Sequence, residues 1–363
     1  MSLRAGTPGT TTPHTLAFVE SPVQLLNVLE WAHSRRPRPR EAPGAGFTLV
    51  VLSPTDPMTR GQLRRMAELA RHDGHQVRWE EARGGPAAPF RTIGGLTREL
   101  RRADRIVMGD PFSRYVQLLL TITRADDLVV VDDGTATMEF VGQLARGERL
   151  VRWHRKGGRQ GPRDLLFAPV SGVARRRLTP GPARRVEVFT SMPIEDAPAG
   201  VSVTANTFAW TRERFGPPRV TKGADVVGTS LVETGVVDGD RYVHAVGVLA
   251  KAHGATRYFA HRRESAEKLH RLAVETGLEV VRPDLPLELI ARRGPIGRTV
   301  LSFPSTVVHT LPLALTGTEV RVAVCDIDPA WLTRTASPRA RGFLTDVTET
   351  ARGIDRLATV TTA

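Results

Sequence analysis

Two adjacent carboxylates, Asp132 and Asp133, follow the apolar run at 128–131 and precede Gly134. Such a run is typical of a buried strand, and in open α/β sheets ligands bind at the carboxyl ends of the strands. Adjacent carboxylates raise each other's pKa, which suits one of them to act as a general base. The same residues also suit an Asx turn that does no more than end the strand. The pattern therefore leaves a catalytic and a structural interpretation open.

A histidine stands in a comparable place in the second half of the chain. His261 follows the predicted strand at 257–259 and precedes Arg262 and Arg263. An imidazole at such a strand end can donate a proton to a departing phosphate, and guanidinium groups beside it stabilise negative charge. A single loop histidine is also a common surface residue, so both interpretations stay open.

Polar residues mark the starts of two further predicted helices. Ser305 and Thr306 follow the strand at 299–301 and stand at the start of a predicted helix. Their hydroxyls, together with the free N–H groups of the helix start, could bind an anion. The alternative is that Ser305 is an ordinary N-cap residue. Glu288, in the segment PLEL at 286–289, could chelate ribose hydroxyls or simply favour the start of a helix. The loop after the first strand of this half adds three small residues, Gly228, Thr229 and Ser230.

The elements that must position these residues alternate along the chain. Short apolar runs separated by helical periodicity are typical of a parallel sheet with helices on both faces. In the first half we expect strands at 16–19, 47–52, 76–79, 105–108 and 128–131, and helices at 23–31, 59–71, 95–102 and 113–121. After Gly134 the pattern loosens into a basic stretch, with a strand at 186–190 and a connector at 193–203. In the second half we expect strands at 225–228, 257–259, 278–281, 299–301 and 319–323, and helices at 242–253, 265–276, 285–291 and 305–313.

Two similar α/β halves joined by a linker, with a cleft between them, form the GT-B arrangement. We therefore predict two Rossmann-like domains, an N-terminal domain at 15–200 and a C-terminal domain at 201–336. Residues 1–14, rich in Thr, Gly and Pro, are expected to form a disordered leader. The tail at 337–363 opens with Ser-Pro, which suits a helix start, and is expected to be helical and to pack back on the N-terminal domain.

Composition narrows the classes of function. The 363 residues carry a formal net charge of +13, which favours a polyanionic partner such as a nucleic acid, a lipid surface or an acidic polymer. The single cysteine, Cys325, excludes an internal disulfide and a cysteine-rich metal site, so we expect a cytoplasmic protein, with the inner face of the membrane as a further possible position. No apolar run is long enough to span a membrane. Dinucleotide-binding, P-loop, zincin and esterase motifs are absent, and no metal-binding cluster stands out.

Taken together, six segments resemble motifs of the bacterial sialyltransferases, in particular the capsular polysialyltransferase and lipooligosaccharide sialyltransferase families. In chain order they are Ser21–Asn27 (SPVQLLN), Asp132–Gly134, Gly228–Glu233 (GTSLVE), His261, Pro286–Leu289 (PLEL) and Ser305–Thr306. Both their order and their spacing agree with those families. One feature departs from the pattern: the broader group has His-Pro, usually after a lysine, whereas here Arg262 follows His261.

The resemblance implies a metal-independent, inverting glycosyltransferase with a GT-B fold and a CMP-activated nonulosonic acid, such as sialic acid or Kdn, as its donor. It implies that Asp132 is the general base, with Asp133 as the alternative, and that His261 is the general acid or charge stabiliser at the leaving phosphate. By the same resemblance, Glu288 would hold the cytidine ribose, and Ser305 with Thr306 would hold the phosphate. Arg262 or Arg263 is expected to replace the charge of the missing lysine. The domain at 15–200 would then supply the base and bind the acceptor, and the domain at 201–336 would bind the CMP-sugar. The residues expected along the rest of the donor site and the cleft are Gly228, Thr229, Ser230, Ser21, Gln24 and Asn27.

The acceptor is expected to be a glycan or an anionic cell-surface polymer, extended either as a polymer or by one residue. A basic strip that includes Arg155, Lys156 and Arg159 is expected to attract such a polymer. No cofactor beyond the sugar nucleotide is expected. Two alternatives stay open: a GT-B enzyme that uses a UDP- or GDP-sugar, and a non-enzymatic polyanion binder. Nucleic acid is not expected as the partner, because no nucleic-acid motif occurs and aromatic residues make up only 6% of the chain.

Overall fold

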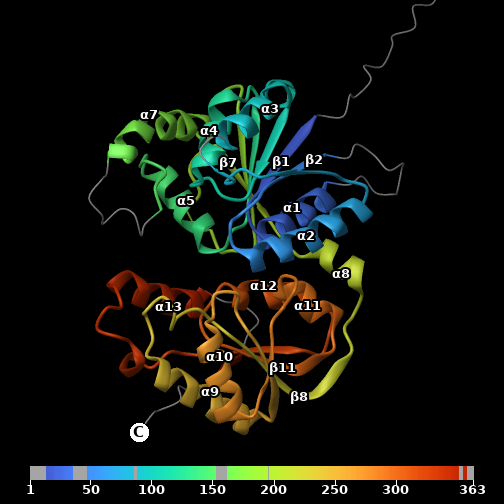
Figure 1. Ribbon diagram of the computed structural model, residues 1–363, viewed down its shortest axis with the longest axis vertical. Coiled ribbons are helices and arrows are strands. Elements are labelled where there is room, and N and C mark those ends of the chain that lie inside the picture. The colour runs from blue at the N-terminus through green and yellow to red at the C-terminus, as the bar shows by residue number, and fades with distance from the viewer. Residues whose placement is uncertain are drawn as a thin grey trace, which may run out of the picture.

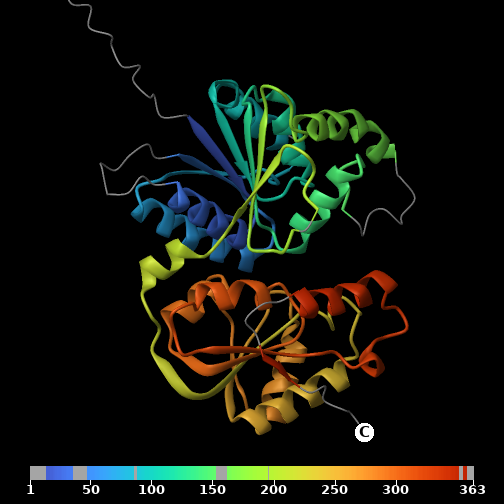
Figure 2. The ribbon, with the colours of Figure 1, turned by 180° about the vertical axis from the view of Figure 1, so that it is seen from behind.

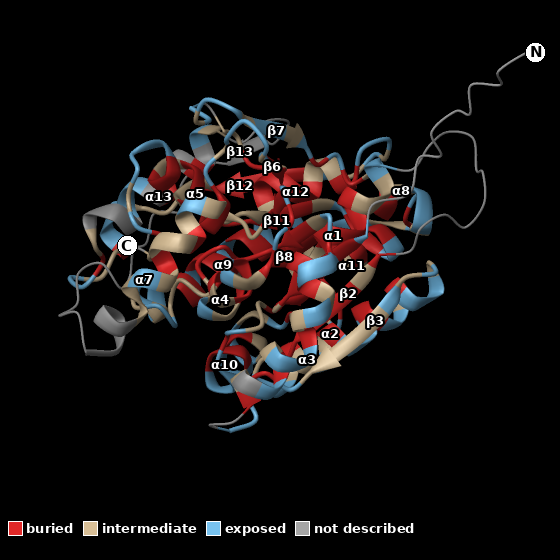
Figure 3. Ribbon diagram, turned by 90° about the horizontal axis from the view of Figure 1, so that it is seen from above, coloured by how far each residue is buried: buried red, intermediate tan, exposed pale blue. Residues whose placement is uncertain are grey.

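The computed structural model describes residues 14–35, 47–85, 88–152, 162–194, 196–350 and 355–357. The chain folds into two lobes, one stacked on the other along the long axis of the molecule (Figure 1). Each lobe is built around a parallel sheet with helices on both faces. Buried residues are concentrated in the strands and on the helix faces that cover them (Figure 3).

The first lobe contains a seven-stranded sheet in the order β3-β2-β1-β4-β5-β6-β7, with every pair parallel. Its strands are β1 Thr15–Val19, β2 Thr48–Leu52, β3 Gln76–Glu80, β4 Arg105–Met108, β5 Asp127–Val131, β6 Arg185–Thr190 and β7 Val201–Ala205. Its helices are α1 Pro22–Ser34, α2 Pro57–His72, α3 Ala88–Arg102, α4 Arg114–Ile122, α5 Thr135–Ala145 and α7 Pro162–Arg177. One apolar cluster lies under α3, α4, α5 and α7, and a second lies under α1 and α2, so both faces of the sheet are covered.

The second lobe repeats this plan with a six-stranded parallel sheet in the order β10-β9-β8-β11-β12-β13. Its strands are β8 Val220–Val227, β9 Ala255–Phe259, β10 Glu279–Val281, β11 Ile296–Ser302, β12 Arg321–Cys325 and β13 Asp355–Leu357. Its helices are α9 Gly239–His253, α10 Ala266–Thr276, α11 Leu287–Arg293, α12 Val307–Ala314 and α13 Pro338–Thr350, with a short 3₁₀ turn η1 at Pro329–Trp331. The predicted α/β fold with two Rossmann-like domains, the GT-B architecture, is thereby confirmed.

Both sheets reverse their winding direction between their first and fourth strands, β1/β4 and β8/β11. In an open parallel sheet, this switch point leaves a crevice at the carboxyl ends of the strands, and ligands bind there. The carboxyl ends of the first sheet point toward the second lobe (Figure 1). The polar turns that the sequence singles out therefore lie along two edges that face each other.

A short helix, α8 (Ala209–Phe215), connects the lobes. In the view from behind, it lies at the left side of the molecule, where the two lobes meet (Figure 2). The buried carboxylate of Glu30, on α1, accepts hydrogen bonds from the backbone N–H of Trp210 (2.9 Å) and from the backbone N–H (2.9 Å) and hydroxyl (2.6 Å) of Thr211. It thereby caps the start of α8, where no side chain of the helix itself does so. Leu289 and Ala314 of the second lobe join the apolar cluster under α1, so the lobes share a packed contact on this side.

The structure differs from the sequence prediction between the lobes and at the tail. Residues 201–205 form β7, so the first sheet continues beyond the predicted boundary at 200 and into the predicted connector. Ser202, Val203 and Ala205 of this edge strand are exposed and polar and apolar residues alternate in it, so no continuous apolar run marks it. The loosened stretch after Gly134 holds α5 and α7, and α7 contains Pro169, which obscured its helical pattern.

At the tail, α13 is followed by β13, which pairs with β12 of the second lobe, so the predicted tail is not helical throughout. Val347 of α13 packs with Val308 and Val324 of the second lobe, and packing of the tail on the first domain stays a prediction. The predicted leader lies almost wholly outside the described residues. Within the described ranges, no helix is both long and apolar enough to cross a membrane.

Candidate active site

The turn at Asp132–Gly134 follows β5 and lies directly against Thr306 of the second lobe. Gly134 has a φ of 66°, a left-handed conformation that favours glycine. A Cβ at this position would come within 2.9 Å of the Thr306 Cγ2 atom. A residue without a side chain is therefore needed both for the turn and for the close approach of the lobes, and two of the predicted motifs meet across the domain boundary.

Asp132 is buried and its carboxylate is fully engaged in hydrogen bonds. One oxygen accepts from the Gly134 N–H (3.0 Å) and the Thr137 hydroxyl (2.9 Å). The other accepts from the N–H (3.1 Å) and the hydroxyl (2.8 Å) of Ser191, the residue after β6. Burial raises the pKa of Asp132, while these donors lower it. The carboxylate thus fixes the turn between β5 and α5 and points into the protein.

Asp133 is placed differently, with 19% of its side chain exposed. One guanidinium nitrogen of Arg152 lies 3.2 Å from the Asp133 carboxylate and 2.8 Å from that of Asp110, so it bridges the two acids. Burial and the neighbouring Asp110 raise the pKa of Asp133 to about 7, against the lowering effects of Arg152, Gln24 and Arg262. A carboxylate with this pKa is half ionised at neutral pH, which is the range that general-base catalysis favours.

The segment SPVQLLN opens α1 and supports the Asp132–Gly134 turn from inside the lobe. The Ser21 hydroxyl caps the helix by accepting from the Gln24 N–H (3.2 Å). The Gln24 side chain hydrogen-bonds to Asp133, and Asn27 donates to the backbone carbonyl of Asp132 (2.9 Å). All three side chains are buried. The structure therefore brings Ser21, Gln24 and Asn27 to the site as residues that position the acidic turn.

His261 lies at the end of β9 and is partly buried. Its Nδ1 atom accepts from the Arg263 N–H (3.2 Å), so the neutral imidazole carries its proton on Nε2. Burial, followed by the charges of Arg262, Arg263 and Lys268, lowers the pKa of His261 to about 4. At neutral pH the ring is therefore an uncharged donor through Nε2.

A buried polar network behind His261 was not predicted from the sequence. The Glu264 carboxylate accepts from the His261 N–H (2.5 Å) and the Tyr258 hydroxyl (2.6 Å), and its Oε1 lies 2.7 Å from the Lys268 Nζ atom. Lys268 also donates to the Thr229 carbonyl (3.2 Å). The network thereby joins the His261 turn to the polar loop after β8. Glu264 and Lys268 follow His261 by three and seven residues, a helical spacing that was the only sequence signal for the network.

Gly228 opens that loop and has no room for a side chain. A Cβ there would lie 2.2 Å from a carboxylate oxygen of Glu264 and 2.6 Å from the Tyr258 hydroxyl. Thr229 is buried beside it, and Ser230 is partly exposed. The loop is thus held against the His261 turn.

The hydroxyls of Ser305 and Thr306 do not cap α12. Thr306 is the N-cap residue, but its side chain makes no capping hydrogen bond. The Ser305 hydroxyl is buried and has no hydrogen-bond partner among the residues that the structure describes. Since buried hydroxyls are almost always hydrogen-bonded in folded proteins, this one fits a ligand oxygen better than an ordinary N-cap role.

Glu288 and Arg262 also lie at the facing edges. Glu288 is buried at the start of α11, where the Thr310 hydroxyl donates to it (2.5 Å), and burial raises its pKa. Burial and Arg263 lower the pKa of Arg262, while the carboxylates of Asp133 and Asp56 in the first lobe raise it. Arg262 therefore interacts electrostatically with the opposite lobe. The predicted acceptor residues Arg155, Lys156 and Arg159 lie outside the described residues.

A pocket of about 690 Å³ opens beside Asp133 in the first lobe. Arg152 and Asp110, the two partners around Asp133, form part of its wall. The wall also holds the aromatic rings of Phe112, Tyr115 and Phe167. Within the described part of the chain, no three His, Cys, Asp or Glu side chains are grouped in a way that could hold a metal ion.

Comparison with known proteins adds evidence for the fold. Neither a known protein family nor a curated protein matches the sequence. The structure is similar to an α/β-galactoside α-2,3-sialyltransferase from Photobacterium phosphoreum, with a TM-score of 0.51 and 9% identity over 96% of this chain and 99% of that one. It is also similar to a putative UDP-N-acetylglucosamine 2-epimerase from Listeria monocytogenes, with a TM-score of 0.50 and 13% identity over 95% and 92% of the two chains. At this level of identity, the similarity shows the two-domain GT-B fold.

Proposed function

We propose that this protein is an inverting glycosyltransferase that transfers a nonulosonic acid from a CMP-sugar to a hydroxyl group of a glycan. The observation that carries the proposal is the contact between the Asp132–Gly134 turn of one lobe and the Ser305–Thr306 turn of the other. Next to this contact in the chain are Asp133, with a pKa of about 7, and Ser305, whose hydroxyl has no hydrogen-bond partner among the described residues, and both support the proposal. Transfer from a sugar phosphate needs a base to deprotonate the acceptor hydroxyl and groups that stabilise the negative charge of the leaving phosphate.

In the proposed step, Asp133 accepts the proton of the acceptor hydroxyl. The acceptor oxygen forms a bond to the anomeric carbon while the bond from that carbon to the phosphate oxygen breaks, and CMP leaves with the bonding electron pair. Attack from the side opposite the phosphate inverts the configuration. We assign the base to Asp133 rather than Asp132, because the Asp132 carboxylate already accepts four hydrogen bonds inside the lobe.

On the other side, His261 donates a hydrogen bond from Nε2 to the leaving phosphate, together with Ser305 and Thr306. Arg262 supplies positive charge in place of the lysine that related motifs carry. A phosphate monoester has a second pKa of about 6, so CMP can leave at neutral pH without full protonation. A neutral imidazole therefore suffices as a charge stabiliser. Glu288, oriented by Thr310, is proposed to hold the cytidine ribose.

The choice of a CMP-sugar rests on the six motifs in order, and the similarity in fold to the Photobacterium sialyltransferase supports a sugar of the sialic acid type. The similarity to the putative UDP-N-acetylglucosamine 2-epimerase keeps a UDP- or GDP-sugar as the competing donor. A metal-independent reaction and a position at the inner membrane face are further parts of the proposal.

The test is a thermal-shift panel followed by product analysis. A ligand present at 100 times its Kd stabilises the native state by about 2.7 kcal/mol, so binding is readily detected. CMP and CMP-nonulosonates should raise the unfolding temperature, and UDP, GDP and ADP should not. Mass spectrometry should then detect one added nonulosonic acid, or a ladder of them, on an oligosaccharide acceptor. Stabilisation by UDP or GDP in place of CMP would contradict the proposal.

A further inference from the structure

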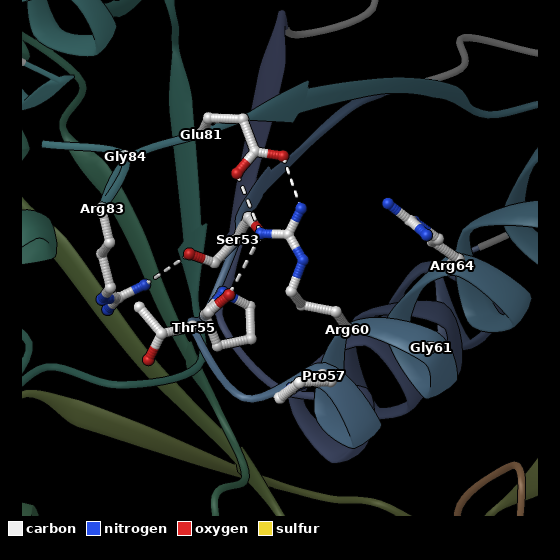
Figure 4. A pocket seen from close by; sticks show the side chains of 10 residues that line it. Ser53, Thr55, Pro57, Arg60, Gly61, Arg64, Glu81, Arg83 and Gly84 are labelled. Carbon is white, nitrogen blue, oxygen red and sulfur yellow. Dashed lines mark hydrogen bonds and ion pairs between the residues drawn. The ribbon is translucent and has the colours of Figure 1, made fainter.

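A second pocket, of about 440 Å³, lies in the first lobe at the ends of β2 and β3. Its wall includes Ser53, Arg60, Arg64, Glu81 and Arg83, and Figure 4 shows it from close by. None of these residues belongs to the six motifs. No part of the reaction proposed above uses this pocket.

Of the three arginines that line this pocket, Arg60 and Arg83 pair with carboxylates, whereas Arg64 has no such partner among the described residues. Arg60 makes two hydrogen bonds to the Glu81 carboxylate (2.9 and 2.7 Å), so these two charges neutralise each other. Arg83 donates to the Ser53 carbonyl (3.1 Å) and to the Glu20 carboxylate (2.6 Å). Arg64, one turn after Arg60 on α2, makes no ion pair or hydrogen bond with any residue that the structure describes, and no dashed line reaches it in Figure 4.

The pocket therefore offers an exposed guanidinium group that pairs with no residue in the described part of the chain. Arg64 also lies 5.8 Å from the centre of the Trp79 ring, which supports its side chain beside the pocket. An Arg side chain binds a carboxylate or a phosphate through paired N–H donors. The chemistry thus favours a ligand that carries an anionic group.

Arg83 lines both this pocket and the 690 Å³ pocket beside Asp133, so the two pockets adjoin at that residue. In the sheet, β5 is followed by β4, β1 and β2, so the strand before Asp133 and the strand before Ser53 are three strand positions apart. At the usual strand spacing, their ends are about 14 Å apart. A single sugar at Asp133 cannot span this distance, whereas an oligosaccharide can.

We propose that the 440 Å³ pocket is a distal acceptor subsite, in which Arg64 binds an acidic sugar of the acceptor chain while the terminal sugar reacts at Asp133. The ligand class is an oligosaccharide with a carboxylate on its repeating sugar. The role in transfer rests on the proposed function, but the binding itself does not. The predicted basic strip at 155–159 is not needed for this subsite.

The matched variants are Arg64→Ala and Arg71→Ala, which remove the same charge from the same helix. Arg71 is exposed in the last turn of α2 and does not line the pocket. The probes are sialic acid oligomers of one, three and five residues and a neutral oligosaccharide of matched length. Binding is measured by calorimetry with the full chain and without donor, and transfer is measured separately with the CMP-sugar.

We expect Arg64→Ala to weaken binding of the trimer and pentamer by roughly fivefold, the scale of an exposed ion pair, and Arg71→Ala to leave it unchanged. The monomer and the neutral oligosaccharide should not respond to either variant. An equal response of monomer and pentamer, an equal response to both variants, or wild-type binding by Arg64→Ala would each overturn the subsite. If Arg64→Ala weakens pentamer binding but no CMP-sugar supports transfer, the subsite stands and the proposed function fails.

Discussion

The first six strands of each lobe follow the same order across the sheet, but the facing edges of the two lobes carry different kinds of side chain. The edge of the first lobe combines carboxylates with arginines, as in the bridge from Asp110 through Arg152 to Asp133. The edge of the second lobe presents an imidazole, a guanidinium and hydroxyls, at His261, Arg262 and Ser305. Its carboxylates Glu264 and Glu288 are buried behind that surface. The shared topology thus brings these two edges face to face, and their different side chains are the basis for the proposed division of roles between the lobes.

The same physical cause shifts the pKa values of the two central groups in opposite directions. Burial disfavours the charged form of any group, which raises the pKa of a carboxyl and lowers that of an imidazole. Asp133 accordingly has a pKa of about 7 and His261 one of about 4. Above pH 7, Asp133 is therefore mainly ionised, whereas His261 is a neutral hydrogen-bond donor.

The largest expected effect separates the two adjacent aspartates. Asp133→Asn should lower kcat by about 10²- to 10⁴-fold, the range for loss of a general base, and leave CMP affinity and the unfolding temperature near wild type. Folding should tolerate the neutral amide, because burial already favours the uncharged form of Asp133. Steady-state kinetics, calorimetry with CMP and thermal unfolding measure the three quantities.

The matched variant Asp132→Asn should behave differently. It places an amide NH₂ against a backbone N–H or a hydroxyl that now donates to the carboxylate, so it should destabilise the fold by about 1–3 kcal/mol. A stable Asp132→Asn protein without activity, together with an active Asp133→Asn protein, would return the base assignment to Asp132.

Removal of the imidazole tests the second half of the site. His261→Ala should lower kcat by about a hundredfold, because the leaving phosphate loses a positioned hydrogen-bond donor. His253→Ala, an exposed histidine at the end of α9, is the control and should remain fully active. Wild-type turnover by a folded His261→Ala protein would remove His261 from the mechanism.

The Ser305 hydroxyl should contribute to nucleotide binding. A hydrogen bond to a charged phosphate is worth about 1.5–3 kcal/mol, so Ser305→Ala should weaken CMP binding by roughly tenfold to hundredfold. Acceptor KM should change little, and Ser202→Ala on the exposed edge strand β7 should bind CMP normally. Unchanged CMP affinity in Ser305→Ala would leave that hydroxyl without a role in donor binding.

The smallest expected effect concerns the neighbour of the base. Asp110→Asn removes a negative charge that raises the pKa of Asp133, so the pH at which kcat/KM reaches half its plateau should fall. The plateau itself should stay close to wild type. Asp126→Asn removes the same charge at the opposite end of β5 and should leave the midpoint unchanged. A midpoint that does not move in Asp110→Asn would show that Asp110 does not tune the base.

Periodicity in the sequence was sufficient to predict both sheets, because buried parallel strands such as β1 and β5 are continuous apolar runs. It was not sufficient for β7, in which Ser202 and Thr204 interrupt the apolar run. The order of the strands in each sheet could not be predicted from the sequence either, because it depends on pairing between segments that are far apart in the chain. It was the topology that placed Asp133 and Thr306 on facing edges.

At the site, the motifs identified the turns but did not predict that Gly134 contacts Thr306 or what each side chain does there. Asp132 and Asp133 are equivalent in sequence, and only their contacts separate a buried organiser of the turn from a partly exposed acid. The sequence did not predict the buried Glu264–Lys268 network, because charged residues on a helix usually lie on its solvent-exposed face. Asp110 and Arg152 lie far apart in the chain and become partners only in the fold.

The most direct test of the account is the pH dependence of kcat/KM between pH 5 and 9, measured for the wild type and for His261→Ala. If Asp133 is the base, kcat/KM should rise with pH through a single ionisation near pH 7 and then level off. His261→Ala should show the same midpoint with a lower plateau, because His261 is already neutral throughout this range. A midpoint that disappears with His261, or a profile without an ionisation near pH 7, would contradict the division of roles between the two lobes.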